Sequence, residues 1–138
     1  MQAQVKWIDG LKFISIGDSG HAIVMDSSTL GEESVAPSPT ELLLQALAGC
    51  TGMDVISILQ KMREPVEGFE IKVEGERAKE HPKVLEHVKL EYIVYGNVNP
   101  DNFEKAINLS QEKYCNISIT LKRAGAKIDI IKTIKQRN

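Results

Sequence analysis

Residues 38–55 read SPTELLLQALAGCTGMDV, and this stretch predicts the long helix around which the rest of the fold is arranged. Ser38 is a good N-cap, Pro39 suits the first helical position, and Glu41 stands three residues after the cap. Together they form a capping box with a proline where its missing N–H costs nothing. The apolar pattern continues beyond this stretch, so the helix is predicted to end at about Met62.

Apolar residues occupy nearly the whole circumference of this predicted helix through its first three turns. They are Leu42, Leu43, Leu44, Ala46, Leu47, Ala48, Cys50, Met53, Val55, Ile56, Ile58, Leu59 and Met62. A helix that is apolar on every side is expected to be buried on every side. A domain of 138 residues has difficulty covering both sides of such a helix. The pattern therefore indicates a partner chain.

Two glycines, Gly49 and Gly52, flank the turn that carries Cys50. Each costs roughly 1 kcal/mol relative to alanine in a helix interior. With the nearby alanines they give a surface of small residues. Either another backbone or a small substrate is expected to lie close to it.

Three short strands are predicted before the helix. Gln2 to Ile8 alternates weakly between apolar and polar residues, Leu11 to Ile16 alternates again, and His21 to Met25 is predicted to be a third strand. The turn signals between them are Asp9-Gly10 and residues 17–20. An antiparallel meander follows, and the polar residues 27–37 are predicted to connect it to the helix.

After the helix, alternation predicts two more strands, from Phe69 to Glu76 and from Val84 to Tyr95. The polar segment Arg77 to Lys83 connects them, so they are expected to pair as a long hairpin. The elements predicted so far are, in chain order, a meander, a long helix and a hairpin. The length of 138 residues indicates one domain, residues 1–138.

The last third of the chain is predicted to hold a second helix, and Asn99-Pro100 gives it a start signal. One face of this helix carries Phe103, Ala106, Ile107, Ser110 and Tyr114. Cys115 follows at its close. Ile117 to Lys122 fits a short helix or a strand, and Ala126 to Ile134 is predicted to be a final strand.

Composition excludes several classes of partner. The chain is 42% hydrophobic and 26% charged, with a formal net charge of −2, so neither nucleic acid nor an anionic membrane is expected to bind it. The N-terminus does not resemble a signal peptide, and no run of 18 residues is free of charge or strong polarity. We expect a cytoplasmic protein without a membrane span, in which a structural disulfide is uncommon.

The chain has two cysteines, Cys50 and Cys115, which stand 65 positions apart (115 − 50). Such thiols commonly pack as small hydrophobic groups in a core. A zinc site is disfavoured, because the sequence lacks a CxxC pair and its three histidines are scattered. A third interpretation is a redox cycle, in which one thiol forms a sulfenic acid and the other closes a disulfide. The residues alone leave these interpretations open.

A reactive thiolate needs a nearby cation or a helix N-terminus. Cys50 lies several turns into its predicted helix, so that helix's own N-terminus is too far away. Any activating cation is therefore expected to come from another part of the fold.

Three segments resemble the OsmC/Ohr family of osmotically inducible and organic-hydroperoxide-resistance proteins. Residues 38–55 look like the family's first-cysteine helix. Residues 74–96, EGERAKEHPKVLEHVKLEYIVYG, are similar to its central hairpin, and residues 106–118, AINLSQEKYCNIS, to its second-cysteine motif. The resemblance spans about residues 38 to 122.

This resemblance implies an α+β, OsmC-like fold that works as an intertwined homodimer, with the cysteine helices packed centrally and the sheets outside. It also implies thiol-dependent reduction of organic or inorganic hydroperoxides in stress defence. Cys50 would be the attacking thiol and Cys115 the resolving thiol, regenerated by a dithiol reductant. Neither a metal nor another cofactor is implied.

The chain departs from the peroxidase members at two points. They carry a glutamate in the first turn of the cysteine helix, where this chain has Thr40, and its neighbour Glu41 lies about 100° round the helix. They also hold the thiolate with an arginine from the N-terminal strands, whereas the first arginine here is Arg63. Arg77, beside the hairpin, is the predicted substitute cation, although a solvated charge explains it equally well.

These departures keep two other functions open. The first is a non-enzymatic dimer that binds a small apolar ligand or senses redox state through its cysteines. The second is a purely structural dimer with inert thiols. The sequence does not identify the peroxide, the ligand, the reductant or the residue that activates Cys50.

Overall fold

The computed structural model describes residues 1–28, 31 and 33–136. Its contacts divide the chain into two compact units, Met1–Leu43 and Leu44–Asn138. The boundary falls inside helix α1 (Pro39–Lys61), whose first turn belongs to the first unit and whose remainder belongs to the second. The assignment of the whole chain to one domain stays a prediction.

The first unit holds the predicted meander of β1 (Ala3–Asp9), β2 (Lys12–Gly17) and β3 (Ala22–Met25). The strands are antiparallel and lie in the order β1-β2-β3. All seven residues of β1 are exposed. This sheet therefore has almost no core of its own.

Both faces of this small sheet carry exposed apolar side chains. Val5 and Ile23 are both opposite Ser15, so all three side chains point to one face. Ile14 is opposite Val24, and this pair points to the other face. Each of these four apolar residues is exposed. A sheet that is apolar on both faces needs cover on both faces.

Helix α1 begins with the predicted capping box. The Ser38 N–H donates to Glu41 Oε2 over 2.7 Å, and the Glu41 N–H donates to Ser38 Oγ over 3.2 Å. The helix ends at Lys61, within one residue of the predicted end. Among the described residues it is the one helix long and apolar enough to cross a bilayer, a test that the core helix of a soluble protein also passes.

The prediction that α1 is buried on every side is wrong for the single chain. The buried residues form one stripe at four-residue spacing: Leu47, Thr51, Val55 and Leu59. Leu43 is 40% exposed and Met53 is 73% exposed. Only one side is buried because the other elements of the second unit pack on that side.

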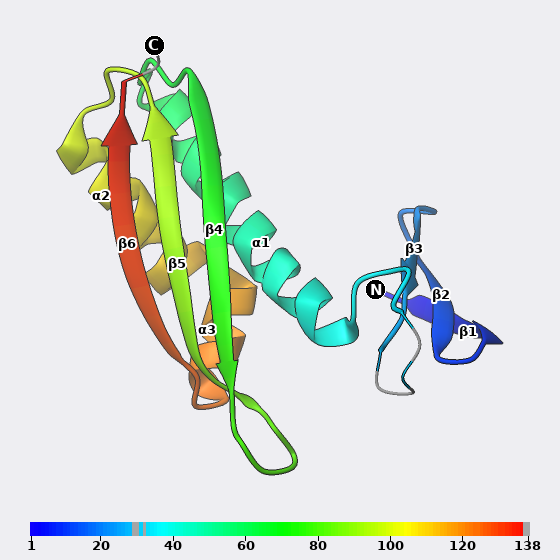
Figure 1. Cartoon of the computed structure of the whole chain (residues 1–138). Coiled ribbons are helices and arrows are strands. Elements are labelled where there is room, and N and C mark those ends of the chain that lie inside the picture. Colours follow the sequence, from blue (N-terminus) through cyan, green and yellow to red (C-terminus); the bar gives the residue numbers. More distant parts are fainter. Residues whose placement is uncertain (29–30, 32, 137–138) are drawn as a thin grey trace. The chain divides into compact units, whose positions relative to one another are not determined.

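The second unit is a two-layer arrangement of one sheet and three helices. Strands β4 (Gly68–Arg77) and β5 (Leu85–Tyr95) form the predicted antiparallel hairpin, and β6 (Lys127–Lys135) pairs with β5 in parallel. The sheet order is β4-β5-β6. Within this unit the helices lie behind the sheet in Figure 1, so the core fills the space between the layers.

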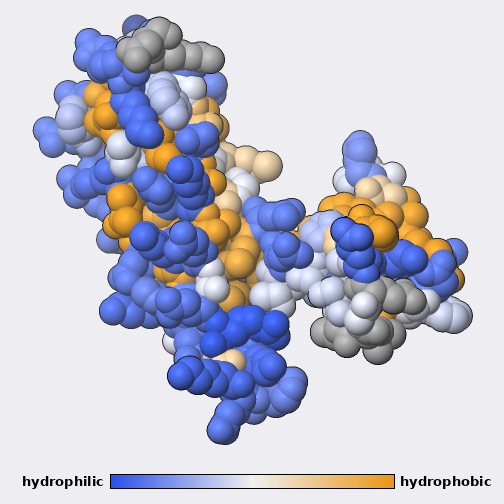
Figure 2. Space-filling model, viewed as in Figure 1, coloured by the Kyte–Doolittle hydropathy of each residue, from blue (hydrophilic) through white to orange (hydrophobic). Residues whose placement is uncertain are grey.

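The opposite face of this sheet carries mostly polar side chains. Figure 2 views the unit from this side and shows hydrophilic residues with hydrophobic ones between them. Glu91 of β5 and Ile131 of β6 are opposite each other and both point to this face, because Tyr92 points into the core.

A helical crossover connects β5 to β6, as a parallel pair requires. It consists of α2 (Pro100–Leu109), the π-helical turn η1 (Ser110–Tyr114) and α3 (Asn116–Arg123). Asn99 caps α2 as predicted, because its side chain accepts from the N–H groups of Asp101 and Asn102. The segment that fitted either a short helix or a strand is helical.

The π turn corrects one sequence expectation. Regular helical spacing placed Tyr114 on the buried face, yet Tyr114 is exposed while Gln111 and Cys115 are buried. In η1 the Cys115 N–H donates to the Ser110 carbonyl five residues earlier, over 2.7 Å. The wider turn shifts the phase of every side chain after Ser110.

Candidate site around the two cysteines

The fold brings the two cysteines together. Cys50 lies in the middle of α1, and Cys115 lies between η1 and α3. Their sulfur atoms are within 4.8 Å of each other, and both thiols are free. Cys50 Sγ donates to Asn116 Oδ1 over 3.6 Å. The predicted cysteine pair is therefore a spatial pair.

The two thiols have different access to solvent. Cys50 is partly exposed, whereas Cys115 is fully buried. Burial raises the pKa of the Cys115 thiol to about 11, although the Ser118 N–H donates to its sulfur over 3.3 Å and acts in the opposite direction. The neighbouring Cys50 and Asp54 raise this pKa further. Cys115 is thus a protonated thiol at neutral pH.

Asp54 is a member of the site that the sequence analysis missed. It lies one helical turn after Cys50 on α1, and one of its carboxylate oxygens is within 4.8 Å of both sulfurs. The signal was available, because residues four apart on a helix share a face. The sequence analysis considered only the apolar residues of this helix and therefore did not single out Asp54.

A buried network of polar side chains leads to Asp54. Ser110 Oγ donates to Asp54 Oδ2 over 2.9 Å. Thr51 Oγ1 is 2.7 Å from Ser110 Oγ and 2.7 Å from the Tyr92 hydroxyl. Gln111 Nε2 donates to Tyr92 over 2.8 Å and to Thr51 over 3.2 Å. Three elements, α1, β5 and η1, therefore meet through hydrogen bonds beside the sulfurs.

The carboxylate fixes the direction of these bonds. Ser110 has one hydroxyl proton, and it is given to Asp54. Thr51 must then donate to Ser110, and Tyr92 must donate to Thr51. Burial raises the pKa of Tyr92 to about 12, so it keeps the proton that this arrangement requires. The hydroxyls of Tyr92, Thr51 and Ser110 therefore each point their proton toward Asp54.

Arg77 is the last residue of β4. Its Nε donates to the Lys83 carbonyl oxygen over 2.8 Å, across the hairpin connection. Glu41 is engaged in the cap of α1. The role of Arg77 as an activating cation stays a prediction.

Three residues of this site could share a metal ion. The donor atoms of Cys50, Asp54 and Cys115 all lie within 4.8 Å of one another. Within the described ranges, no other three His, Cys, Asp or Glu side chains are placed to share a metal ion. Two thiolates and a carboxylate would leave one position of a tetrahedral zinc site open. Metal binding would require the Cys115 thiol to lose its proton, which its raised pKa disfavours.

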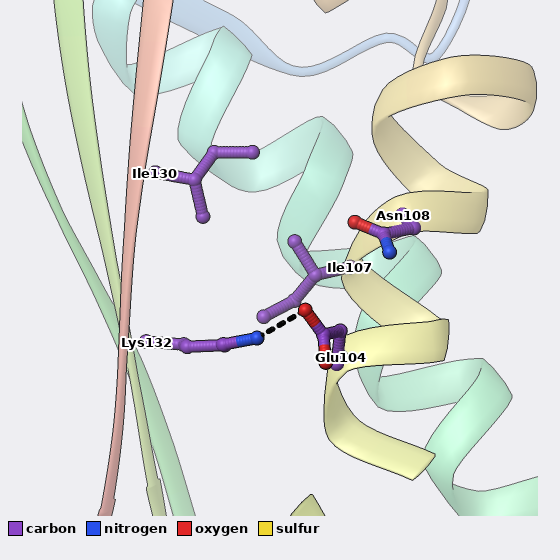
Figure 3. A pocket seen from close by; sticks show the side chains of 5 residues that line it. All are labelled: Glu104, Ile107, Asn108, Ile130 and Lys132. Atoms are coloured by element: carbon purple, nitrogen blue, oxygen red, sulfur yellow. Dashed lines mark ion pairs between the residues drawn. The ribbon is translucent and has the colours of Figure 1, made fainter. Parts of the chain in front are cut away.

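A hollow of about 430 Å³ lies beside the site. Its lining residues are Met53, Asp54, Ser57, Ile58, Lys61, Leu109 and Tyr114. A separate hollow of about 190 Å³ lies between α2 and β6, where Lys132 and Glu104 form an ion pair across it (Figure 3). Neither cysteine lines either hollow, but the first one is bounded by Asp54 of the site, whereas no residue of the site lines the second.

Comparison with known proteins agrees with this geometry. A family model described as OsmC-like protein matches residues 31–131. Protein YhfA of Escherichia coli K12 is 44% identical over 125 residues, which are 90% of this chain and 91% of that protein.

Solved structures extend the comparison. A hypothetical protein of Aquifex aeolicus is 29% identical, with a TM-score of 0.86 over 99% of this chain and 97% of that chain. An organic hydroperoxide resistance protein OsmC of Legionella pneumophila, also described as a predicted redox protein, shares the fold at 17% identity. Its TM-score is 0.68 over 97% of this chain and 95% of that chain. With its paired cysteines, its α+β fold and a family match over most of its length, the chain is a member of the OsmC-like protein family.

Proposed function

We propose that this protein is a thiol peroxidase that reduces hydroperoxides through a sulfenic acid and a disulfide. The observation that carries the proposal is the approach of the two sulfurs to within 4.8 Å, with one partly exposed and the other buried. Family membership supports it, as does the name of the Legionella pneumophila protein.

The proposed cycle has three steps. The Cys50 thiolate attacks one oxygen of the peroxide and the O–O bond breaks, which gives a Cys50 sulfenic acid and an alkoxide that takes a proton from solvent and leaves as the alcohol. The Cys115 thiol then displaces the hydroxyl as water, and a disulfide forms. A dithiol reductant restores both thiols by exchange and is itself oxidised.

The difference in exposure supports this division of roles between the two thiols. A peroxide from solvent reaches Cys50 first, because Cys115 has no exposed surface. The disulfide then requires the sulfurs to close from their separation, under 4.8 Å, to a bond of about 2.05 Å. Rotation of the two side chains is a small movement compared with the refolding of a helix.

The same proposal includes a homodimer. Met53 on α1 is 73% exposed and Trp7 of the N-terminal sheet is 65% exposed. Apolar groups of this size, gathered on a helix and on both faces of a sheet, are typical of an interface. A second copy of the chain would cover them. A cytoplasmic location, where dithiol reductants are abundant, stays part of this proposal.

Peroxide consumption with a dithiol reductant tests the cycle. Cys50→Ser is expected to abolish turnover because no sulfenic acid forms. Cys115→Ser is the matched control for loss of one thiol. It is expected to accept the first oxidation and then to over-oxidise, which mass spectrometry detects as extra oxygen on Cys50. Wild-type turnover no faster than that of Cys50→Ser would remove the proposal.

The hollow beside Asp54 favours a second candidate, the binding of a small apolar ligand. Met53, Ile58 and Leu109 give it apolar walls, and its volume of about 430 Å³ suits a small molecule. Native mass spectrometry of the purified protein would show a retained ligand. A retained ligand together with the absence of peroxide turnover would support this candidate over the peroxidase.

A further inference from the structure

The peroxidase cycle leaves one proton without a carrier. In the resolving step the Cys115 thiol must lose its proton as its sulfur bonds to Cys50. The hydroxyl on the Cys50 sulfenic acid must gain a proton to leave as water. Cys115 is fully buried, so solvent cannot take the proton directly.

Asp54 is placed to carry this proton. Its carboxylate oxygen lies within 4.8 Å of both sulfurs, which are the donor of the proton and the atom that bears the leaving hydroxyl. A closing movement of the sulfurs, or one bridging water, brings these groups within hydrogen-bond reach. No other carboxylate in the described ranges shares this position with the two sulfurs.

We propose that Asp54 is the proton shuttle of the resolving step. Its carboxylate accepts the Cys115 thiol proton while Cys115 Sγ attacks the Cys50 sulfur. The S–O bond of the sulfenic acid breaks, and Asp54 returns the proton to the departing hydroxide, which leaves as water. Asp54 ends as it began, and no outside oxidant or reductant enters this step. The proposal rests on the peroxidase function.

The hydroxyl network prepares Asp54 for this role. The hydroxyls of Tyr92, Thr51 and Ser110 all point their protons toward the carboxylate, so Asp54 is held as an acceptor. Ser110 occupies one site on Oδ2. A carboxylate has about four lone-pair sites, so the remaining ones can receive a proton. Ser110 and Thr51 are therefore positioning residues.

The other charged and titratable groups near the sulfurs do not compete for this role. Tyr92 of β5 donates its proton into the network. Lys122 of α3 donates to the Gln111 carbonyl oxygen over 3.0 Å. Lys61 of α1 lines the hollow beside Asp54, about two helical turns further along.

The test separates the two oxidation steps. One equivalent of hydroperoxide is mixed with the reduced protein, and quenched-flow mass spectrometry follows the sulfenic acid and then the disulfide. In Asp54→Asn the amide oxygen can still accept from Ser110, so the network keeps its form. The sulfenic acid is expected to form, and its conversion to the disulfide is expected to slow by about 10² or more.

The pH profile gives a readout that a structural role would not change. In Asp54→Asn the Cys115 proton must pass to hydroxide, so disulfide formation is expected to quicken about tenfold per pH unit between pH 6 and 8. In the wild type the same rate is expected to be nearly level. Asp54→Glu, which keeps a carboxylate, should restore a level profile, and Asp101→Asn on the exposed start of α2 is the matched control.

The outcomes distinguish this proposal from the function on which it rests. If the wild type forms no sulfenic acid, the peroxidase function fails, and the shuttle fails with it. If the sulfenic acid forms normally and Asp54→Asn closes the disulfide at the wild-type rate, the shuttle alone is overturned. If Asp54→Asn does not fold, a level profile in Asp54→Glu supports the shuttle and a tenfold slope refutes it.

Discussion

At the scale of single residues, the informative contrast is between two chemically identical side chains. Cys50 and Cys115 lie side by side, yet one is partly exposed and the other is buried. Burial disfavours a thiolate because a charge is poorly solvated inside a protein. Position alone therefore divides the pair into an accessible thiol and a protected one.

This burial predicts a loss of stability in alkali. The pKa of Cys115 is raised from 9.0 to about 11, so the folded chain holds a proton that the unfolded chain releases. The stabilisation is complete below pH 9 and is lost as pH rises toward 11. Between pH 8 and 10 the free energy of unfolding is expected to fall by about 1–2 kcal/mol from this residue.

Urea unfolding of the reduced protein at both pH values measures this loss. Cys115→Ala is the control, because this variant has no thiol to titrate at position 115. The cavity that the substitution leaves lowers stability equally at each pH. The fall between pH 8 and 10 should be smaller in the variant by about 1 kcal/mol. An identical fall in both proteins would show that folding does not raise the pKa of the Cys115 thiol.

At the scale of elements, the π turn η1 determines which side chains reach the site. It turns Gln111 and Cys115 inward together and leaves Tyr114 exposed. Thr51 of α1 then bonds to Tyr92 of β5 and to Ser110 of η1. Among the described residues, no buried side-chain nitrogen or oxygen lacks a partner. The three elements are thus joined by polar contacts as well as by the apolar core.

Removal of the central hydroxyl should weaken this junction. Thr51→Val keeps the shape of the side chain but leaves Ser110, Tyr92 and Gln111 each short of a partner. The free energy of unfolding is expected to fall by about 1–3 kcal/mol. Thr120→Val, at an exposed position of α3, is the matched control and should change stability by less than about 0.5 kcal/mol.

Chemical denaturation at pH 7 compares the two variants. Equal effects of Thr51→Val and Thr120→Val would mean that the buried hydroxyl network contributes nothing to the packing of α1 against β5 and η1.

At the scale of the whole molecule, a single chain leaves too much apolar surface uncovered. The outer side of α1 and both faces of the N-terminal sheet expose large apolar side chains. A stable interface of this kind typically covers about 800 Å² on each partner. The proposed homodimer would supply that cover with no further partner.

Light scattering at micromolar concentration is expected to give the mass of two chains. Met53→Lys places a charge on the outer side of α1 and should shift the mass toward one chain. Ile131→Lys is the matched control, because Ile131 is also exposed but points to the polar face of the second sheet, away from α1. A wild-type mass of one chain would contradict the dimer.

Much of this protein follows from local sequence signals. The capping box at Ser38, the alternation in the strands and the start signal at Asn99 predicted the helices and strands nearly to the residue, because caps, turns and periodicity act over a few neighbours. The two cysteine motifs also indicated the family. The parallel pairing of β6 with β5 had no such signal, since a crossover brings together strands far apart in sequence.

Tertiary structure alone decided the composition of the site. Nothing in the sequence marks the π turn at Ser110, and without it regular spacing would point Tyr114 inward. Asp54 reads as one polar residue on an apolar helix until Cys115 folds against it. Distances between sulfur and carboxylate depend on how α1, β5 and η1 pack, and packing is set by contacts between residues remote in the chain rather than by any one segment.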